Sequence, residues 1–185
     1  MSFFENFNNN LFLKKTPPAD SSMLTLKELG ELRDMYEDLN FVKYYDNING
    51  SFKKFFKLND LYYPEDFVQE VLYDSSRVIT EIKNYFDRAR PYVLASKYGI
   101  DLDPVYLKSA LTPAYPSGHA AQGILLAKIF GIMYPHLAYD FMEIGNNIGL
   151  SRKIGKVHYD SDIKVGKQLG EALFDYIKIT IDEEF

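Results

Sequence analysis

Two of the three histidines in this 185-residue sequence have neighbours that could support catalysis by nucleophilic attack or proton transfer. His158 lies four residues before Asp162, a spacing at which the carboxylate can accept a hydrogen bond from the imidazole. Such a bond fixes the tautomer and leaves the other ring nitrogen free to attack or to accept a proton. His119 follows Ser117 and Gly118 in the segment PSGH, where a helix is predicted to begin. Backbone N–H groups, the serine hydroxyl and the positive end of the helix dipole could bind an anion there, beside His119.

Three basic residues are predicted to point inward, where such an anion would meet them. Lys83 and Arg90 fall within the apolar stripe of a helix predicted over 64–90, whereas Arg88 falls on the opposite, solvated face. Arg152 continues the apolar face of a later helix. A cation turned toward a core is costly unless an anion or a carboxylate meets it. The three inward cations therefore indicate a binding site for an anion, or else structural ion pairs.

Each of these features also has a plain structural interpretation when it is taken alone. Ser117 could be an ordinary helix N-cap, and the two cations of the 64–90 helix could extend along the surface to reach water. A His/Asp pair at this spacing is more often structural than catalytic. The third histidine, His136, belongs to no motif and is interpreted as structural, at a helix start.

The elements that must hold these residues are all predicted to be helices. Helical spacing and end signals predict helices over 21–40, 64–90, 117–133, 136–152 and 158–178. Segment 41–63 is predicted to form short helical turns and loops, and 98–116 a loop with several prolines. The predicted fold is an all-α, single-domain helical bundle over 21–185, preceded by a mobile N-terminal arm over 1–20.

Composition excludes several classes of function. A net charge of −5 argues against nucleic-acid binding through a basic surface, and the lack of cysteine excludes disulfides and thiol chemistry. The sequence shows neither a signal peptide nor an apolar run of the roughly 20 residues that a membrane span needs. We therefore expect a soluble, cytoplasmic protein that acts on a small molecule; whether it forms a homo-oligomer is left open.

Three segments, taken in order, carry a resemblance to a known family. They are KNYFDRARP with Lys83 and Arg90, PSGH with Ser117 to His119, and SRKIGKVHYDSD with Arg152, His158 and Asp162. Together they resemble the three-part signature of the type 2 phosphatidic acid phosphatase superfamily. That superfamily includes lipid phosphatases, bacterial class A non-specific acid phosphatases and vanadium haloperoxidases. The chain looks most like the soluble class A acid phosphatases, although secreted members carry the signal peptide that is missing here.

This resemblance implies a metal-independent phosphatase of the haloperoxidase-like fold that hydrolyses phosphomonoesters through a phosphohistidine. His158 would be the nucleophile, Asp162 would orient it, and His119 would protonate the leaving oxygen and then activate water. The phosphate oxygens would be held by the remaining signature residues, which are Lys83, Arg90, Ser117, Gly118 and Arg152. No metal or other cofactor is implied, vanadate is expected to inhibit, and the pH profile should be bell-shaped on the acid side of neutrality.

Three other functions are compatible with the same residues. In a haloperoxidase the pocket would hold vanadate as a cofactor that activates peroxide. A non-catalytic module would only bind phosphate, and a membrane lipid phosphatase is disfavoured because no span is found. The leaving group is also open among nucleotides, sugar phosphates, pyrophosphate and lipid phosphates, since loops at 41–63 and 92–115 form the pocket mouth.

Overall fold

The computed structural model describes residues 2–184, with side chains up to residue 178, and that part of the chain is helical without any strand. The α-helices are α1 (Asn10–Leu13), α2 (Met23–Arg33), α3 (Leu39–Asp46), α4 (Ile48–Leu58), α5 (Glu65–Phe86), α6 (Pro91–Lys97), α7 (Gly118–Met133), α8 (Ala138–Ile154) and α9 (Asp160–Glu184). Short 3₁₀ turns lie at Lys108–Ala110 and Pro135–Leu137. The predicted all-α fold is confirmed. None of the described helices is both long and apolar enough to cross a membrane.

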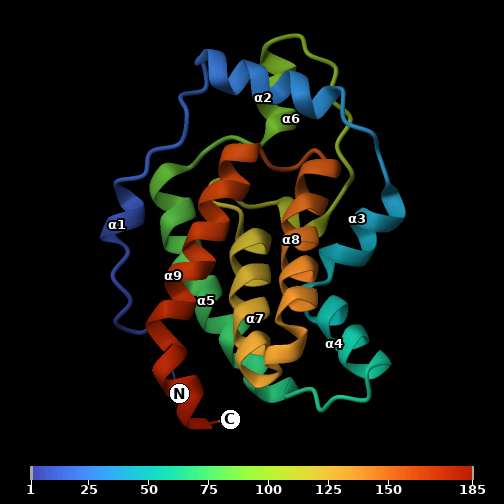
Figure 1. Ribbon diagram of the computed structural model, residues 1–185. Coiled ribbons are helices and arrows are strands. Elements are labelled where there is room, and N and C mark those ends of the chain that lie inside the picture. The colour runs from blue at the N-terminus through green and yellow to red at the C-terminus, as the bar shows by residue number, and fades with distance from the viewer. Residues whose placement is uncertain (1, 185) are drawn as a thin grey trace.

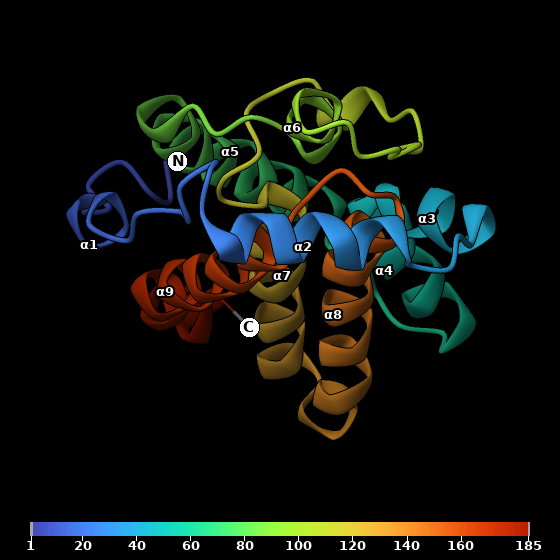
Figure 2. The ribbon, with the colours of Figure 1, turned by 90° about the horizontal axis from the view of Figure 1, so that it is seen from above.

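Four long helices, α5, α7, α8 and α9, form the body of the molecule, with α2 and α6 at its upper end (Figure 1). Helices α3 and α4 pack against α8, and the view from above shows α2 crossing the ends of the bundle (Figure 2). Helix α7 is the central element, because its side chains are buried on every face through most of its length. The C-terminal ends of α5 and α8 and the N-terminal ends of α7 and α9 all point to the upper end.

The close approach of α7 and α9 depends on a glycine. A Cβ at Gly166 would collide with the carbonyl oxygen of Ser117, so a larger residue there would push the two helices apart. At this crossing the Ser117 N–H donates to the carbonyl oxygen of Asp162 at 3.0 Å. The packing of the two helices therefore places two of the predicted site residues side by side.

Helix α5 begins one residue from its predicted start but ends four residues early, at Phe86. Asp87 adopts a left-handed conformation, with φ of 45°, and donates its N–H to the Lys83 carbonyl oxygen, which closes the helix. Residues 87–90 lie outside any helix, and Pro91 then begins α6, which the sequence patterns did not predict. The segment 41–63 is more regular than predicted, because it contains most of α3 and all of α4.

The N-terminal segment, residues 2–20, runs beside α5 and α9 (Figure 1). Phe4 and Phe12 are 3% and 2% exposed and belong to the main apolar core. The N–H of Phe3 donates to Asp74 Oδ2 on α5 at 2.6 Å. The segment predicted as a mobile arm thus contributes side chains to the core, and the domain boundary at residue 20 stays a prediction.

Candidate active site

The predicted site residues gather where four helix ends meet at the upper end of the bundle. They are Lys83 in the last turn of α5, Arg90 before α6, Ser117, Gly118 and His119 at the start of α7, Arg152 in the last turn of α8, and His158 and Asp162 at the start of α9. All are buried except Gly118 and His119, which are partly exposed. The structure therefore brings all eight together around one buried point.

His158 is held so that one ring nitrogen is occupied and the other faces the cations. Its Nδ1 lies 3.2 Å from Asp162 Oδ2, an oxygen that also accepts the Tyr159 N–H at 2.9 Å. Its Nε2 lies 2.9 Å from Nη1 of Arg90. Burial, reinforced by the charges of Arg90 and Lys83, holds the pKa of His158 well below its usual value. The ring is thus neutral, with its proton on the Asp162 side and its Nε2 lone pair turned to the cationic pocket.

Two of the cations are buried without a carboxylate partner in the described part of the chain. Lys83 donates to the carbonyl oxygen of Pro113, and Arg90 donates to those of Thr112 at 2.7 Å and Val157 at 2.8 Å. Backbone carbonyls satisfy the N–H groups but carry no compensating charge. This arrangement fits a pocket whose missing charge is supplied by a bound anion.

The pKa values of these cations show the same lack of negative charge. Burial and then the charge of Arg90 lower the pKa of Lys83 to about 7. Burial and then the charge of Arg152 lower the pKa of Arg90 to about 10. Phosphate bound among Lys83, Arg90 and Arg152 would raise the pKa values of Lys83 and Arg90, because an anion stabilises the protonated forms of both side chains.

Arg152 and His119 meet at a carboxylate that the sequence analysis did not single out, Asp46 at the end of α3. Arg152 Nη1 lies 2.5 Å from Asp46 Oδ1, while its Nε is buried with no hydrogen-bond partner among the described residues. His119 Nε2 lies 2.9 Å from the Asp46 carbonyl oxygen and 3.3 Å from Oδ1. The bond to the carbonyl requires a proton on Nε2, so Nδ1 is the nitrogen left for a substrate. Ser109 completes the group by donating to Asp46 Oδ1 at 2.6 Å.

These contacts set the charge states around His119. Burial acts to raise the pKa of Asp46, but hydrogen bonds from His119 and Ser109 and the charge of Arg152 outweigh it and hold that pKa well below its usual range. Burial and the charge of Arg152 lower the pKa of His119, and Asp46 opposes that shift. Asp46 is therefore ionised and favours the protonated form of His119.

The structure shows Ser117 as the N-cap of α7, and its role in binding an anion stays a prediction. Its side-chain oxygen accepts the N–H of Ala120 at 3.3 Å, as an N-cap does, and this leaves the hydroxyl proton able to donate. A Cβ built on Gly118 would lie 3.9 Å from Cε of Lys83 and 3.3 Å from Ile79. The start of α7 thus stands directly beside the cationic pocket.

The prediction that Arg88 faces solvent is wrong, since the residue is 4% exposed. Its Nη1 donates to Asp162 Oδ1 at 2.6 Å and to Ser161 Oγ at 2.8 Å, and its guanidinium lies 3.9 Å from the centroid of the Tyr159 ring. Its Nη2 lies 3.5 Å from Glu28 Oε2 of α2, whose carboxylate also accepts the Ser161 N–H at 2.7 Å. Arg88 therefore sits between two buried carboxylates, one of which is the partner of the predicted nucleophile.

The end of α5 explains this error. The sequence argument placed Arg88 and Arg90 by a helical period of 100° per residue, but the helix stops at Phe86. In a chain that has left the helix, residues two apart can point to the same side, so both arginines turn inward. Arg90 is buried as predicted, although it is not helical as that argument assumed.

The geometry agrees with a comparison of the whole sequence with known families. The profile of the PAP2 superfamily matches residues 71–182, which is more than half of the chain and includes all eight predicted site residues. The chain belongs to the PAP2 superfamily. This finding confirms the predicted resemblance. Asp46 and Glu28 lie outside the matched range, which explains why no family motif pointed to them.

Within the PAP2 superfamily, two curated relatives are acid phosphatases. The non-specific acid phosphatases of Salmonella typhimurium and Salmonella typhi are 34% and 33% identical to this chain over 94 residues. That stretch is 50% of this chain but only 36% of each relative. The likeness thus spans about a third of the length of the curated relatives.

Proposed function

We propose that this protein is a phosphatase that hydrolyses phosphomonoesters through a phosphohistidine at His158. The observation that carries the proposal is the orientation of His158, whose Nδ1 lies on Asp162 while Nε2 faces Arg90 in a buried cationic pocket. A neutral imidazole whose free nitrogen faces an anion site can attack the phosphorus atom of a phosphate bound there. The names of the Salmonella relatives support the same class of reaction.

In the first step the Nε2 lone pair of His158 forms a bond to phosphorus as the ester P–O bond breaks. The electrons of that bond go to the alcohol oxygen, which takes a proton from His119 and leaves as the neutral alcohol. His158 carries positive charge in the phosphoenzyme, and the Asp162 carboxylate beside Nδ1 compensates for it. Lys83, Arg90 and Arg152 offset the charge on the equatorial oxygens.

In the second step water replaces the histidine. His119, now neutral, accepts a proton from water as its oxygen bonds to phosphorus, and the N–P bond electrons return to Nε2 of His158. Inorganic phosphate leaves, and both histidines regain their starting protonation states. Asp46 assists by holding His119 Nε2 at the carbonyl oxygen and by favouring reprotonation.

Metal independence is part of the proposal, because three cations, Lys83, Arg90 and Arg152, lie around the pocket proposed for the phosphate. Charge compensation of phosphoryl oxygens by arginine and lysine is the role that Mg²⁺ has in many other phosphoryl-transfer sites. Vanadate, which adopts the five-coordinate geometry of the transition state, is expected to inhibit by occupying the same pocket. The cytoplasmic location and the exclusion of nucleic acid stay predictions from the sequence, and the oligomeric state stays open.

The direct test is steady-state hydrolysis of phenyl phosphate by the purified chain in the presence of EDTA. We expect turnover that EDTA does not reduce and that micromolar to millimolar vanadate suppresses competitively. Turnover that EDTA abolishes and Mg²⁺ restores would contradict the metal-independent mechanism. A protein that binds vanadate but hydrolyses no phosphomonoester would leave the phosphate-binding module or the peroxidase as the better description.

The pH dependence of kcat/KM should show an acid optimum. Its basic limb should fall below the usual histidine range, because the pKa of His119 is lowered and this residue must be protonated to act as the acid. Phosphate binding should weaken further as pH rises through about 7, where Lys83 loses its charge. His158 stays neutral well below its usual pKa, so activity should persist into acid solution.

The variant Asp46→Asn provides the internal check on this profile. It removes the carboxylate that raises the pKa of His119, so the basic limb should move to lower pH. The substrate itself titrates near about pH 6. The quantity to compare is therefore the difference in the pH of the basic limb between the wild type and Asp46→Asn. Asp101→Asn, in an exposed loop, should leave the profile in place. If the basic limb of Asp46→Asn lies at the same pH as in the wild type, the proposed role of His119 as the proton donor is contradicted.

A further inference from the structure

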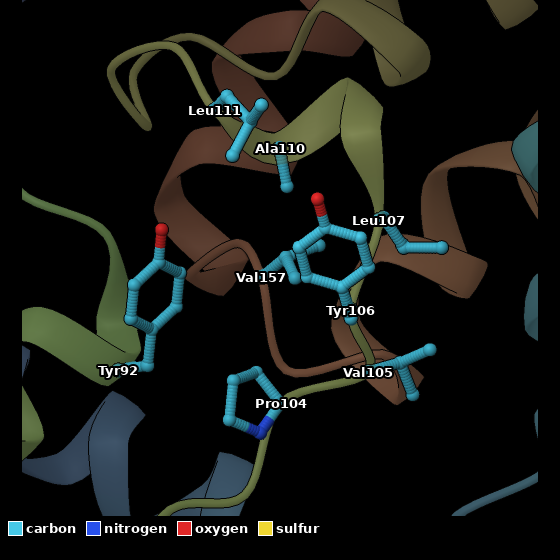
Figure 3. Close-up of a pocket in the computed structure, with 8 residues that line it drawn as sticks. All are labelled: Tyr92, Pro104, Val105, Tyr106, Leu107, Ala110, Leu111 and Val157. Carbon is cyan, nitrogen blue, oxygen red and sulfur yellow. The ribbon is translucent and has the colours of Figure 1, made fainter.

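A pocket of about 260 Å³ lies in the loop between α6 and α7, and the proposed mechanism does not use it. It is lined by apolar and tyrosine side chains, and none of its lining residues carries a charge (Figure 3). Tyr92 lies on the left of the view and the Tyr106 ring overlaps Val157 near its centre, and both hydroxyls point toward the side where Leu111 lies (Figure 3). A concave, mostly apolar site with a few polar groups is the usual form of a small-molecule pocket.

This pocket shares its wall with the phosphate site. Val157, in the wall, directly precedes His158, and its carbonyl oxygen accepts from the same Arg90 Nη1 that lies 2.9 Å from His158 Nε2. Ala110, also in the lining, directly follows Ser109, whose hydroxyl lies 3.1 Å from Arg152 Nη2. Neighbouring Cα atoms are only about 3.8 Å apart, so the pocket lining and the phosphate site meet at these two pairs of consecutive residues.

The floor and the rim of the pocket differ in a way that suits a binding site. The floor residues Val105, Leu107 and Val157 are at most 9% exposed and pack with Val42 of α3 in one apolar cluster. The rim residues Tyr106 and Leu111 are 77% and 71% exposed. The large side chains still open to water are at the rim, so an apolar group that enters the pocket and covers Tyr106 and Leu111 gains free energy.

The lining residues also indicate which chemical groups would bind poorly in this pocket. Sugar hydroxyls placed against Leu107 and Val157 would lose water without gaining partners, at a cost for each hydroxyl. A second phosphate or a carboxylate would find no cation in the lining. The volume lies below the 300–1,000 Å³ range typical of drug-sized ligands, so a single ring or a short branched chain fits better than a nucleoside.

We propose that this pocket holds the apolar part of the substrate alcohol, and that the natural substrates are phosphomonoesters of aryl or short apolar alcohols. The inference rests on the phosphatase function proposed above and assigns its leaving group. The phosphate lies among Lys83, Arg90 and Arg152, while the apolar group lies over Val157 between the two tyrosines. Binding energy from this remote part of the substrate then serves to position phosphorus before His158.

The test compares phenyl phosphate with glycerol phosphate in the wild type and in the rim variants Tyr106→Ala and Leu111→Ser. Intrinsic differences in leaving-group reactivity cancel when the ratio of the two kcat/KM values is compared between proteins. We expect each rim variant to lower that ratio by roughly tenfold, because phenyl phosphate loses more binding energy than glycerol phosphate does. The variant Tyr139→Ala, at an exposed tyrosine in the first turn of α8, should leave the ratio as it is.

Competition between phosphonates separates binding from turnover. Phenylphosphonate should bind more tightly than methylphosphonate to the wild type, and the rim variants should lose most of this difference. Unchanged ratios and unchanged phosphonate preference in both variants would overturn the pocket assignment while leaving the phosphatase intact. If the wild type hydrolyses neither ester, the proposed function fails. The assignment of a leaving group then fails with it. A preference for phenylphosphonate that the rim variants abolish would still show that the pocket binds apolar groups beside an anion site, and no such preference would overturn the pocket as a binding site too.

Discussion

Replacing His158 with alanine is expected to reduce phosphomonoester turnover by on the order of 10⁴-fold or more, because the proposed mechanism requires a covalent bond to this residue. The cations Lys83, Arg90 and Arg152 remain in this variant, so vanadate or phosphate should still bind. The first measurement is kcat with phenyl phosphate. The second is mass spectrometry of rapidly quenched wild-type protein, where the phosphoryl group should be found on the peptide that contains His158.

Because His158 is fully enclosed, its removal could disturb the local packing as well as the chemistry. His158→Asn, which keeps more of the volume and a polar atom near Asp162, should be equally inactive while its thermal unfolding stays close to that of the wild type. His136→Ala is the matched control, since that histidine lies exposed in a 3₁₀ turn and should be dispensable. A His158 variant that folds and keeps turnover within tenfold of the wild type would rule out the phosphohistidine.

Replacing Arg88 with methionine should lower kcat by roughly 10²-fold, by analogy with partners that orient a catalytic ligand, although Arg88 touches no substrate in the mechanism above. Arg88 positions Asp162, with Nη1 2.6 Å from Oδ1, and Asp162 in turn holds His158. Burial already raises the pKa of Asp162, and Arg88 is the first of the groups that oppose this rise. Without Arg88 that pKa rises further, so the ionised form of Asp162 that the proposed mechanism needs is lost at a higher pH than in the wild type.

The consequence for the pH profile has a definite sign. A protonated Asp162 no longer compensates the charge that forms on His158, so the acid limb of kcat should move to higher pH in Arg88→Met. Besides Arg88, Asp162 meets His158, the N–H of Tyr159 and the charges of Lys83 and Arg90, and all of these remain in the variant. Arg88→Lys keeps a positive charge. It should therefore recover part of kcat, and the acid limb of its pH profile should lie close to that of the wild type.

A purely structural role for Arg88 would predict a different pattern. In that case Arg88→Met would lower the thermal unfolding temperature and the fraction of active protein, while the limb stayed at its wild-type pH. Removing one partner from a buried charged network costs about 3–5 kcal/mol of stability, so unfolding must be measured alongside kinetics. Arg33→Met serves as the control, because that side chain is 53% exposed and its ion pair among the described residues is with its neighbour Asp34. An unshifted acid limb in a folded Arg88→Met protein would contradict the positioning role.

Local sequence patterns were sufficient for much of the helical framework. The starts of α5 and α7 were predicted to within one residue, because Pro64 and Ser117 are strong helix-start signals followed by a regular apolar period. The end of α5 was missed, since Asp87 takes a left-handed conformation that favours glycine or asparagine. Helix α6 was missed for a related reason, because it is only seven residues long and falls within a segment predicted as a loop.

By itself the sequence determined the residue types of the site and their order in three motifs. Those motifs are local, with spacings of a few residues, and a helix or a helix end converts such spacings directly into geometry. Only the tertiary structure decided which other side chains contact and orient the motif residues. Asp46 reaches His119 and Arg152 across 73 and 106 residues of chain, and Glu28 reaches Ser161 across 133. Such contacts follow from how α2 and α3 pack on the bundle, and no periodicity or motif in the sequence encodes that packing.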